Sequence, residues 1–229
     1  MNHKIIKDIT LILCLFAFIQ NSSVNASQII NPNLLEFSLS LQNQTADLKY
    51  SSNTYKTQTD YLGINWYEPF SQYFHGGLEL GSIEMTQINN PITTAQFTTG
   101  EYIGLLLRFI PIETDSLSLM LNFNYRYNRT QGENTNQQTQ FAWNEALFVS
   151  ELQYYPLRNL GLIFAVEYQV LDGEQRDLGT INQITAFHES EQQNYRFGIN
   201  FTSNRSGVVG LEWFTGFKHG SRLYFMRKF

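Results

Sequence analysis

The stretch LSLMLNFNYRYN, residues 117–128, decides the fold of this chain of 229 residues. Its odd positions hold only leucine, phenylalanine and tyrosine, whereas its even positions are polar or charged except for Met120. Successive side chains of a β-strand point to opposite faces, so a strand over these residues has one apolar and one polar face. The segment therefore predicts a two-faced β-strand.

Nine other segments repeat this alternation and, with the first, make ten candidate strands. They cover residues 35–41, 62–66, 74–80, 103–109, 146–154, 162–170, 195–201, 209–217 and 223–229. After residue 26 no run reaches the roughly 18 apolar residues of a membrane-spanning helix. An exported, aromatic-rich chain can still cross a membrane if its apolar residues alternate along strands.

The connections between these segments alternate in length. Short ones lie at residues 68–72, 111–116, 156–159 and 203–206, and longer polar ones at 42–53, 86–96, 129–139 and 172–193. Bacterial outer-membrane barrels have short periplasmic turns, longer outer loops and an even number of strands. We therefore predict an all-β, transmembrane, antiparallel up-and-down β-barrel of ten strands. Eight strands are the alternative, because the hairpin near residues 218–221 is very short.

The first 26 residues have the pattern of a cleaved secretory signal. Lys4 and Lys7 precede an apolar run over residues 9–19, and a polar stretch then ends at the small residue Ala26. The run is too short for a transmembrane helix, which needs roughly 20 apolar residues. We predict cleavage after Ala26 and one barrel domain over residues 27–229.

Composition limits the classes of function that the predicted mature chain can have. It keeps 13 Lys and Arg against 19 Asp and Glu, a net charge of −6, which disfavours nucleic acid as a partner. The one cysteine, Cys14, lies in the predicted signal, so no disulfide or thiolate site is expected. A lipoprotein anchored through Cys14 is disfavoured, because Leu13 stands where a small residue would be expected.

Charged side chains on the polar parity of the strands point to a barrel interior. Six are negative and four positive, and mixed signs inside a narrow barrel can pair, which limits the cost of desolvation. The predicted interior charge network consists of Glu36, Glu79, Arg108, Arg126, Glu145, Glu151, Glu167, Arg196, Glu212 and Arg222.

Aromatic residues gather at strand ends on the apolar parity, as expected for the two membrane interfaces. The predicted periplasmic girdle consists of Trp66, Phe74, Phe109, Tyr154, Phe201 and Phe229, and the outer girdle of Tyr125, Tyr127, Tyr168 and Phe217. Two girdles favour a membrane barrel over a soluble β-sandwich, which is the alternative for an alternating pattern. The predicted location is the outer membrane of a Gram-negative bacterium.

The end of the chain carries a more specific motif. Residues 218–225, KHGSRLYF, resemble the polar-x-Gly-x-x-apolar-x-apolar pattern of a final strand read by barrel-insertion machinery, and Phe229 is a typical last residue. On these residues the chain resembles the small outer-membrane β-barrel families, the OmpA/OmpX-like group in the broad sense. Arg227 departs from their pattern, which has an apolar residue at that position. The resemblance implies the insertion machinery, outer-membrane lipids and lipopolysaccharide as partners.

Only weak signals of catalysis are present. No zinc, phosphate-loop or nucleophile-elbow motif occurs, and we expect no metal or cofactor. Some small outer-membrane barrels deacylate lipid A with a His-x-Ser pair, and this chain has two such pairs, His188 with Ser190 and His219 with Ser221. A serine nucleophile needs a base within hydrogen-bonding reach, and residues two apart on a strand share a face.

Three functions follow as hypotheses. The favoured one is a non-enzymatic structural or surface-interaction role, in which polar loops held by a rigid barrel bind an unidentified extracellular ligand. The alternatives are a lipid A-modifying hydrolase and a narrow passive pore. Barrels of eight to ten strands are just wide enough for side chains to fill, so conduction would be slow.

Overall fold

The computed structural model describes residues 34–51, 53–93, 97–134, 136–203 and 207–229, which form antiparallel strands throughout. The predicted signal peptide and its cleavage site lie outside these residues. The strands are β1 Glu36–Tyr50, β2 Thr54–Pro69, β3 Phe74–Ile88, β4 Phe97–Glu113, β5 Leu117–Asn134, β6 Gln137–Leu157, β7 Leu160–Gly179, β8 Gln183–Glu189, β9 Gln193–Thr202, β10 Gly207–Gly216 and β11 Lys218–Lys228. No helix in the described ranges is long and apolar enough to span a membrane.

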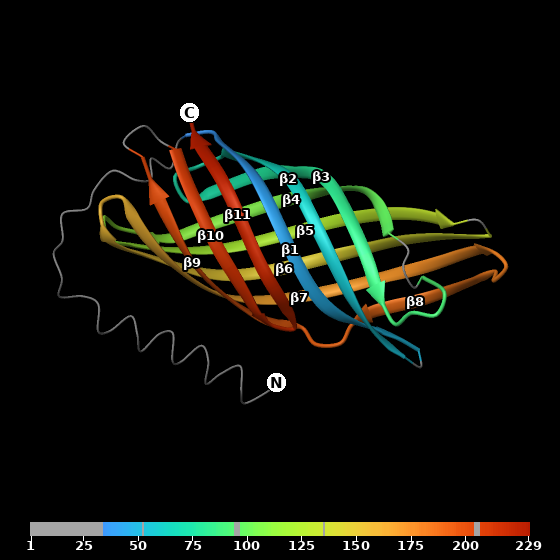
Figure 1. The fold of residues 1–229 in the computed structure, drawn as a ribbon. Coiled ribbons are helices and arrows are strands. Elements are labelled where there is room, and N and C mark those ends of the chain that lie inside the picture. The colour runs from blue at the N-terminus through green and yellow to red at the C-terminus, as the bar shows by residue number, and fades with distance from the viewer. Residues whose placement is uncertain (1–33, 52, 94–96, 135, 204–206) are drawn as a thin grey trace.

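Ten of these strands close into a barrel, as the sequence predicts (Figure 1). Each of β1 to β7 pairs with the next, β7 pairs with β9, and β9 to β11 lead back to β1. The ring closes with Glu36 of β1 opposite Lys228 of β11, so both strands meet at the end of the barrel that carries the C-terminus. The ten predicted segments lie one in each of these strands, apart from the single end residues 35, 217 and 229, and the prediction of ten strands is confirmed.

The eleventh strand, β8, builds a second ring on top of the first. It pairs with residues 172–177 of β7 on one side and with residues 48–50 of β1 on the other. At this level the wall therefore runs from β1 to β8, without β9, β10 and β11. We call the ring of ten strands the membrane section and this outer ring the extension. Eight strands are wrong for the membrane section, but they describe the extension.

Strand length separates the two sections. β9, β10 and β11 have 10, 10 and 11 residues, which is the length of a tilted strand that just crosses a bilayer. β5, β6 and β7 have 18, 21 and 20 residues and continue to the right in Figure 1, beyond the ends of the three short strands. The extension therefore stands outside the membrane.

The predicted long outer loops are mostly strand, and this part of the prediction was wrong. β5 and β6 remain paired up to Asn134 and Gln137, and β7 and β8 up to Asp177 and Gln183. Here the face that turns toward water is mostly polar, and apolar side chains turn inward except near the outer ends of the strands. The apolar parity therefore inverts along a strand: in β1, Leu39 and Leu41 face outward, whereas Leu48 faces inward.

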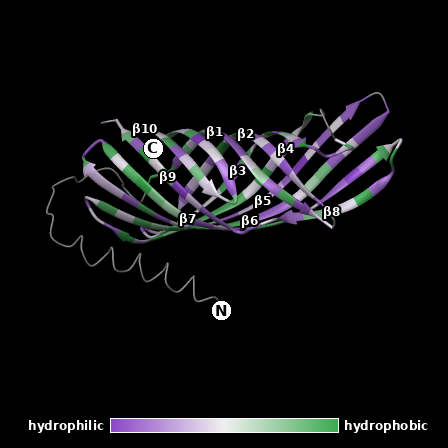
Figure 2. Cartoon of the chain, turned by 60° about the horizontal axis from the view of Figure 1, so that its bottom comes forward, coloured by the Kyte–Doolittle hydropathy of each residue, from purple (hydrophilic) through white to green (hydrophobic). Residues whose placement is uncertain are grey.

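The membrane section has the reverse polarity of a soluble protein. Its outward apolar residues form an exposed belt, in which Leu80, Ile103 and Leu105 are more than half exposed. Their neighbours along each strand are polar and point into the barrel, which produces the alternating bands of Figure 2. Soluble monomers rarely expose a continuous apolar surface of this kind, so lipid is the solvent that the belt fits.

The two aromatic girdles are found on this outer face, with one exception. Nine of the ten predicted residues are exposed or half-buried on the outward side: Trp66, Phe74, Phe109, Tyr125, Tyr127, Tyr154, Tyr168, Phe201 and Phe229. Phe217 instead lies buried in the interior. The cause is Gly216, whose φ of 118° breaks the alternation at the β10–β11 turn and directs the next side chain inward.

Arg227 is accommodated at the rim of the barrel. It points outward, and its guanidinium carbon lies 5.1 Å above the centre of the Phe229 ring. A cation over an aromatic face at the interface keeps its charge near the headgroups while its stem covers apolar surface. Phe229 in turn packs edge-on against Phe37, which stacks on Trp66 at 6.0 Å. The last strand is therefore fixed into the periplasmic girdle by ring contacts.

Candidate functional site

The interior of the membrane section is filled by an ion-pair network. All ten predicted charges point inward and each takes part in at least one ion pair, joined by Lys218 and Lys228. The network therefore contains six carboxylates and six cations, so its formal charge is zero. A neutral interior of paired charges is what a narrow barrel needs to hold ionised groups away from bulk water.

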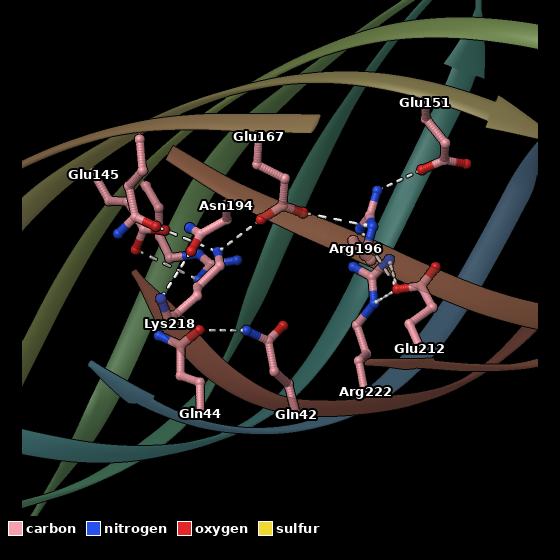
Figure 3. Close-up of polar contacts among 12 residues, drawn as sticks. Gln42, Gln44, Glu145, Glu151, Glu167, Asn194, Arg196, Glu212, Lys218 and Arg222 are labelled. Carbon is pink, nitrogen blue, oxygen red and sulfur yellow. Dashed lines mark hydrogen bonds and ion pairs between the residues drawn. The ribbon is translucent and has the colours of Figure 1, made fainter. Parts of the chain in front are cut away.

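Arg196 of β9 is the centre of this network (Figure 3). It is ion-paired with Glu151 through Nη2, with Glu167 through Nε at 3.5 Å and with Glu212 through Nη1 at 3.5 Å. Its side chain is only 6% exposed. The three carboxylates come from β6, β7 and β10, so this one guanidinium connects strands that are separated in the ring.

One lysine and one arginine, Lys218 and Arg222, complete the charge balance around Arg196. Lys218 is ion-paired with Glu167 at 3.1 Å, and Arg222 is ion-paired with Glu212 at 2.6 Å. Both come from β11, the last strand of the chain. The final strand thus gives each of Glu167 and Glu212 a second cationic partner besides the shared Arg196.

A second group of charges fills the opposite wall. Arg126 of β5 binds Glu79 at 2.6 Å and approaches Glu145 at 3.8 Å, and it lies against the rings of Tyr61 and Tyr102. The two tyrosines cover the guanidinium on the side toward the extension. Aromatic faces above a buried cation reduce its desolvation cost.

Arg108 likewise binds a carboxylate and lies against a tyrosine ring, nearer the periplasmic rim. It makes a forked contact with Glu36, at 3.0 and 3.3 Å, and lies 4.0 Å from the centre of the Tyr67 ring. Lys228 is 4.0 Å from the same carboxylate. A cavity of about 140 Å³ lies between these groups and the Arg196 cluster, and its lining is mainly polar. A cavity of this volume has room for several water molecules, since a water takes up roughly 30 Å³ in the liquid.

An aromatic plug closes the barrel above the charges, inside the extension. It consists of Tyr50, Phe141, Trp143 and Phe187, all at most 5% exposed. Phe187 of β8 lies at its centre, with ring centroids 5.4 Å from Tyr50, 6.1 Å from Phe141 and 6.4 Å from Trp143. An eight-stranded ring is only wide enough for side chains, so four aromatic rings fill it.

A polar cap covers the plug on its outer side. Gln87 donates to the Tyr50 hydroxyl at 2.6 Å, Asn90 donates to Gln87 at 2.6 Å, and Gln175 donates to Asp177 at 2.9 Å. Asn90 follows β3 and reaches across the mouth to Gln175 of β7 at 3.3 Å. Burial raises the pKa of the Tyr50 hydroxyl, although its hydrogen bond to Gln87 opposes this, so Tyr50 stays neutral.

The two His-x-Ser pairs lie on the outer surface instead of in this interior. His188, Ser190 and His219 are exposed, and Ser221 is half-buried. Across the described residues no hydrogen bond joins the histidine of either pair to its serine. Ser190 and His219, one from each pair, line the same surface groove.

The amino-acid sequence matches no family model and no curated protein, so the comparison rests on three-dimensional structure. The translocator domain of the autotransporter NalP from Neisseria meningitidis is similar at a TM-score of 0.53 and 10% identity, over 99% of this chain and 96% of that chain. The outer membrane protease OmpT from Escherichia coli gives a TM-score of 0.46 at 11% identity, over 90% and 100% of the two chains. The outer membrane protein OprG from Pseudomonas aeruginosa gives 0.44 at 11%, over 83% and 95%.

This chain has the outer-membrane β-barrel fold. The lipid-facing belt and the fold together are those of a protein of the Gram-negative outer membrane, as the sequence predicts. In such barrels the short turns face the periplasm. Here the turns after β2, β4 and β6 are short and lie at the same end as the C-terminus, so the extension of the barrel projects from the cell.

Sequence reasoning missed several residues of the barrel interior, and three of them show why. Lys228 shares the inward parity of Arg222, so the alternation of the last strand could have placed it. Lys218 was assigned to a turn, and its inward direction depends on where β11 begins. Phe187 was placed in a loop, and in the barrel it is the centre of the plug.

Proposed function

We propose that the barrel is a closed, non-enzymatic scaffold that presents its extension as a rigid binding surface outside the cell. The observation that carries this proposal is the contrast between its two sections. The interior is occupied by paired charges, plug and cap, whereas β5 to β8 remain hydrogen-bonded well beyond the membrane section. A structure that continues outward on paired strands holds its surface in one shape, which favours recognition over transport.

The tip of the β7–β8 hairpin is the favoured contact surface. Leu178, Ile181 and Ile184 are 43%, 41% and 63% exposed there. β7 continues for eleven residues beyond Tyr168, its last pair with β9, which at about 3.3 Å per residue is roughly 35 Å along the strand. Apolar side chains this far from the belt do not contact the membrane in which the barrel is embedded. Exposed apolar clusters at such places mark contacts with another macromolecule, and we infer a protein partner.

Replacing the three tip residues by serine tests this surface. We expect L178S/I181S/I184S to abolish most of the retention of expressing cells on wells coated with extracellular-matrix or serum proteins. The barrel itself should still assemble, because none of the three side chains points inward, and heat-modifiable gel migration reports this. The matched control is I88S/F97S, which removes two exposed apolar residues at the ends of β3 and β4. If both variants lose retention equally, or if neither loses it, the hairpin tip is not the contact surface.

The pore alternative receives less support, because an ion would have to pass both the cap and the plug. The hydrolase alternative receives less support because each His-x-Ser pair lacks the hydrogen bond between base and nucleophile that such chemistry needs.

Lipid A analysis separates the enzymatic from the non-enzymatic proposal. We expect the lipid A mass spectrum of cells that express the wild-type barrel to equal that of cells with an empty vector. S190A and S221A should give the same spectrum. A loss of one acyl chain that appears with the wild type and disappears with either serine variant would establish the hydrolase.

A further inference from the structure

A notch interrupts the outer surface where the eight-stranded ring passes over the three short strands. A tight turn at Gly216 and Phe217 joins β10 to β11. The chain from β8 to β9 crosses just above this turn at Ser190 and Glu191. The Ser190 amide donates to the Asp47 carbonyl at 3.2 Å, and the Phe217 amide to the Gln193 carbonyl at 3.2 Å, which fixes both crossings. The resulting groove has a volume of about 350 Å³.

The pairing register places this notch at the height of the lipid headgroups. Leu41 of β1 lies opposite Leu223 of β11, and Leu41 belongs to the exposed apolar belt. Four pairs farther out, Thr45 lies opposite His219, which lines the notch. Trp213, exposed on β10 at the level between them, is an interfacial anchor.

The lining of the notch suits a phosphorylated sugar better than an acyl chain. Its floor is Ala46 and the buried Phe217, whereas its exposed walls carry Lys56, His219 and the carboxylates Asp47 and Glu191. An ammonium and an imidazole N–H can donate to phosphate oxygens, and carboxylates accept hydrogen bonds from sugar hydroxyls. The volume also falls within the range of small-molecule sites, at its lower end.

We propose that the notch binds the phosphorylated sugar head group of an outer-leaflet glycolipid. Lys56 and His219 hold the phosphate, Asp47 and Glu191 hold sugar hydroxyls, and the acyl chains extend down along the belt beside Trp213. The ring of eight strands above the notch acts as an overhang that limits how far the head group can rise. The lipid is thereby fixed beside the extension without entering the barrel.

Native mass spectrometry of the purified full barrel in detergent, titrated with bis-phosphorylated lipid A, tests the site. We expect K56A/H219A to weaken binding by about tenfold or more, because it removes two donors to a charged group. The matched control is K49A/H188A, which removes the same residue types from an adjacent exposed pair that does not line the notch. The control variant should bind as the wild type does. A similar loss in both variants would reduce the effect to general charge attraction and overturn the proposal.

A blocking variant and two further lipids identify what the notch recognises. S190W adds a bulky ring at the notch wall while keeping the backbone amide that bonds to Asp47, and it should weaken lipid A binding as strongly as K56A/H219A does. Dephosphorylated lipid A and phosphatidylglycerol should each bind the wild type at least tenfold more weakly. If S190W has no effect, the notch is not the site. If phosphatidylglycerol binds equally well, a glycolipid head group is not what it selects.

Discussion

Replacement of Arg196 by leucine is expected to lower the free energy of unfolding by about 3–5 kcal/mol, because it leaves buried carboxylates without their shared cation. Glu167 and Glu212 keep Lys218 and Arg222 as partners, whereas among the residues that the structure describes Glu151 is ion-paired with Arg196 alone. The loss should appear as a lower urea midpoint for the barrel folded in lipid vesicles, followed by tryptophan fluorescence.

Arg176 supplies the matched control for Arg196. Its ion pair with Glu174 lies on the outside of the extension, where the two side chains are 47% and 49% exposed. An exposed pair of this kind contributes about 0–1 kcal/mol, so R176L should change the midpoint little. The double variant E151L/R196L should recover a large part of the loss, because it removes the stranded carboxylate together with the cation. If R196L and R176L lose equal stability, the interior network does not stabilise the barrel in the way described.

The alternation at residues 117–128 was sufficient to predict the membrane section, for a physical reason. In lipid every outward side chain must be apolar, while the interior of a narrow barrel holds the polar ones, so the pattern is strict wherever a strand crosses the bilayer. The same rule placed all ten predicted charges inside, although it could not tell which carboxylate meets which arginine. That choice depends on register between strands far apart in the sequence, as with Arg126 and Glu79.

The extension could not be predicted by the same rule, because water surrounds it. There the apolar side chains point inward, so the sign of the pattern inverts along a strand and looks like the end of the strand. In β6, Phe148 faces lipid on one parity, whereas Phe141 and Trp143 fill the plug on the other. β8 is harder still to predict from the sequence. Its apolar residues lie on both faces, with Ile184 outward and Phe187 inward, so apolar and polar residues do not alternate along it. A parity inversion in an otherwise regular strand is therefore a signal for the membrane boundary.

Removal of two of the four aromatic side chains in the plug is expected to turn a silent barrel into a conducting one. Wild-type barrels in planar bilayers should show no stepwise current, because Tyr50, Phe141, Trp143 and Phe187 fill the eight-stranded ring. W143A/F187A leaves a gap between the polar cap and the polar cavity below, which is already large enough for water, so that only hydrophilic side chains remain on the path. Stepwise currents should follow, whereas truncation of two aromatic side chains on the lipid-facing side, F148A/F164A, should leave the barrel silent.

Each of these truncations also removes buried apolar surface and costs about 3–5 kcal/mol of stability, so a failure to fold must be distinguished from a closed channel. W143C/F187A provides that distinction, since the only native cysteine lies in the predicted signal peptide. Barrels that migrate as folded on gels should conduct with the free thiol at position 143. They should become silent again when a bulky maleimide alkylates it, because the added group refills the ring. Folded barrels that stay silent before alkylation would show that the plug alone is not what closes the interior, and would assign that role to the polar cap above it or to the Arg196 network beneath it.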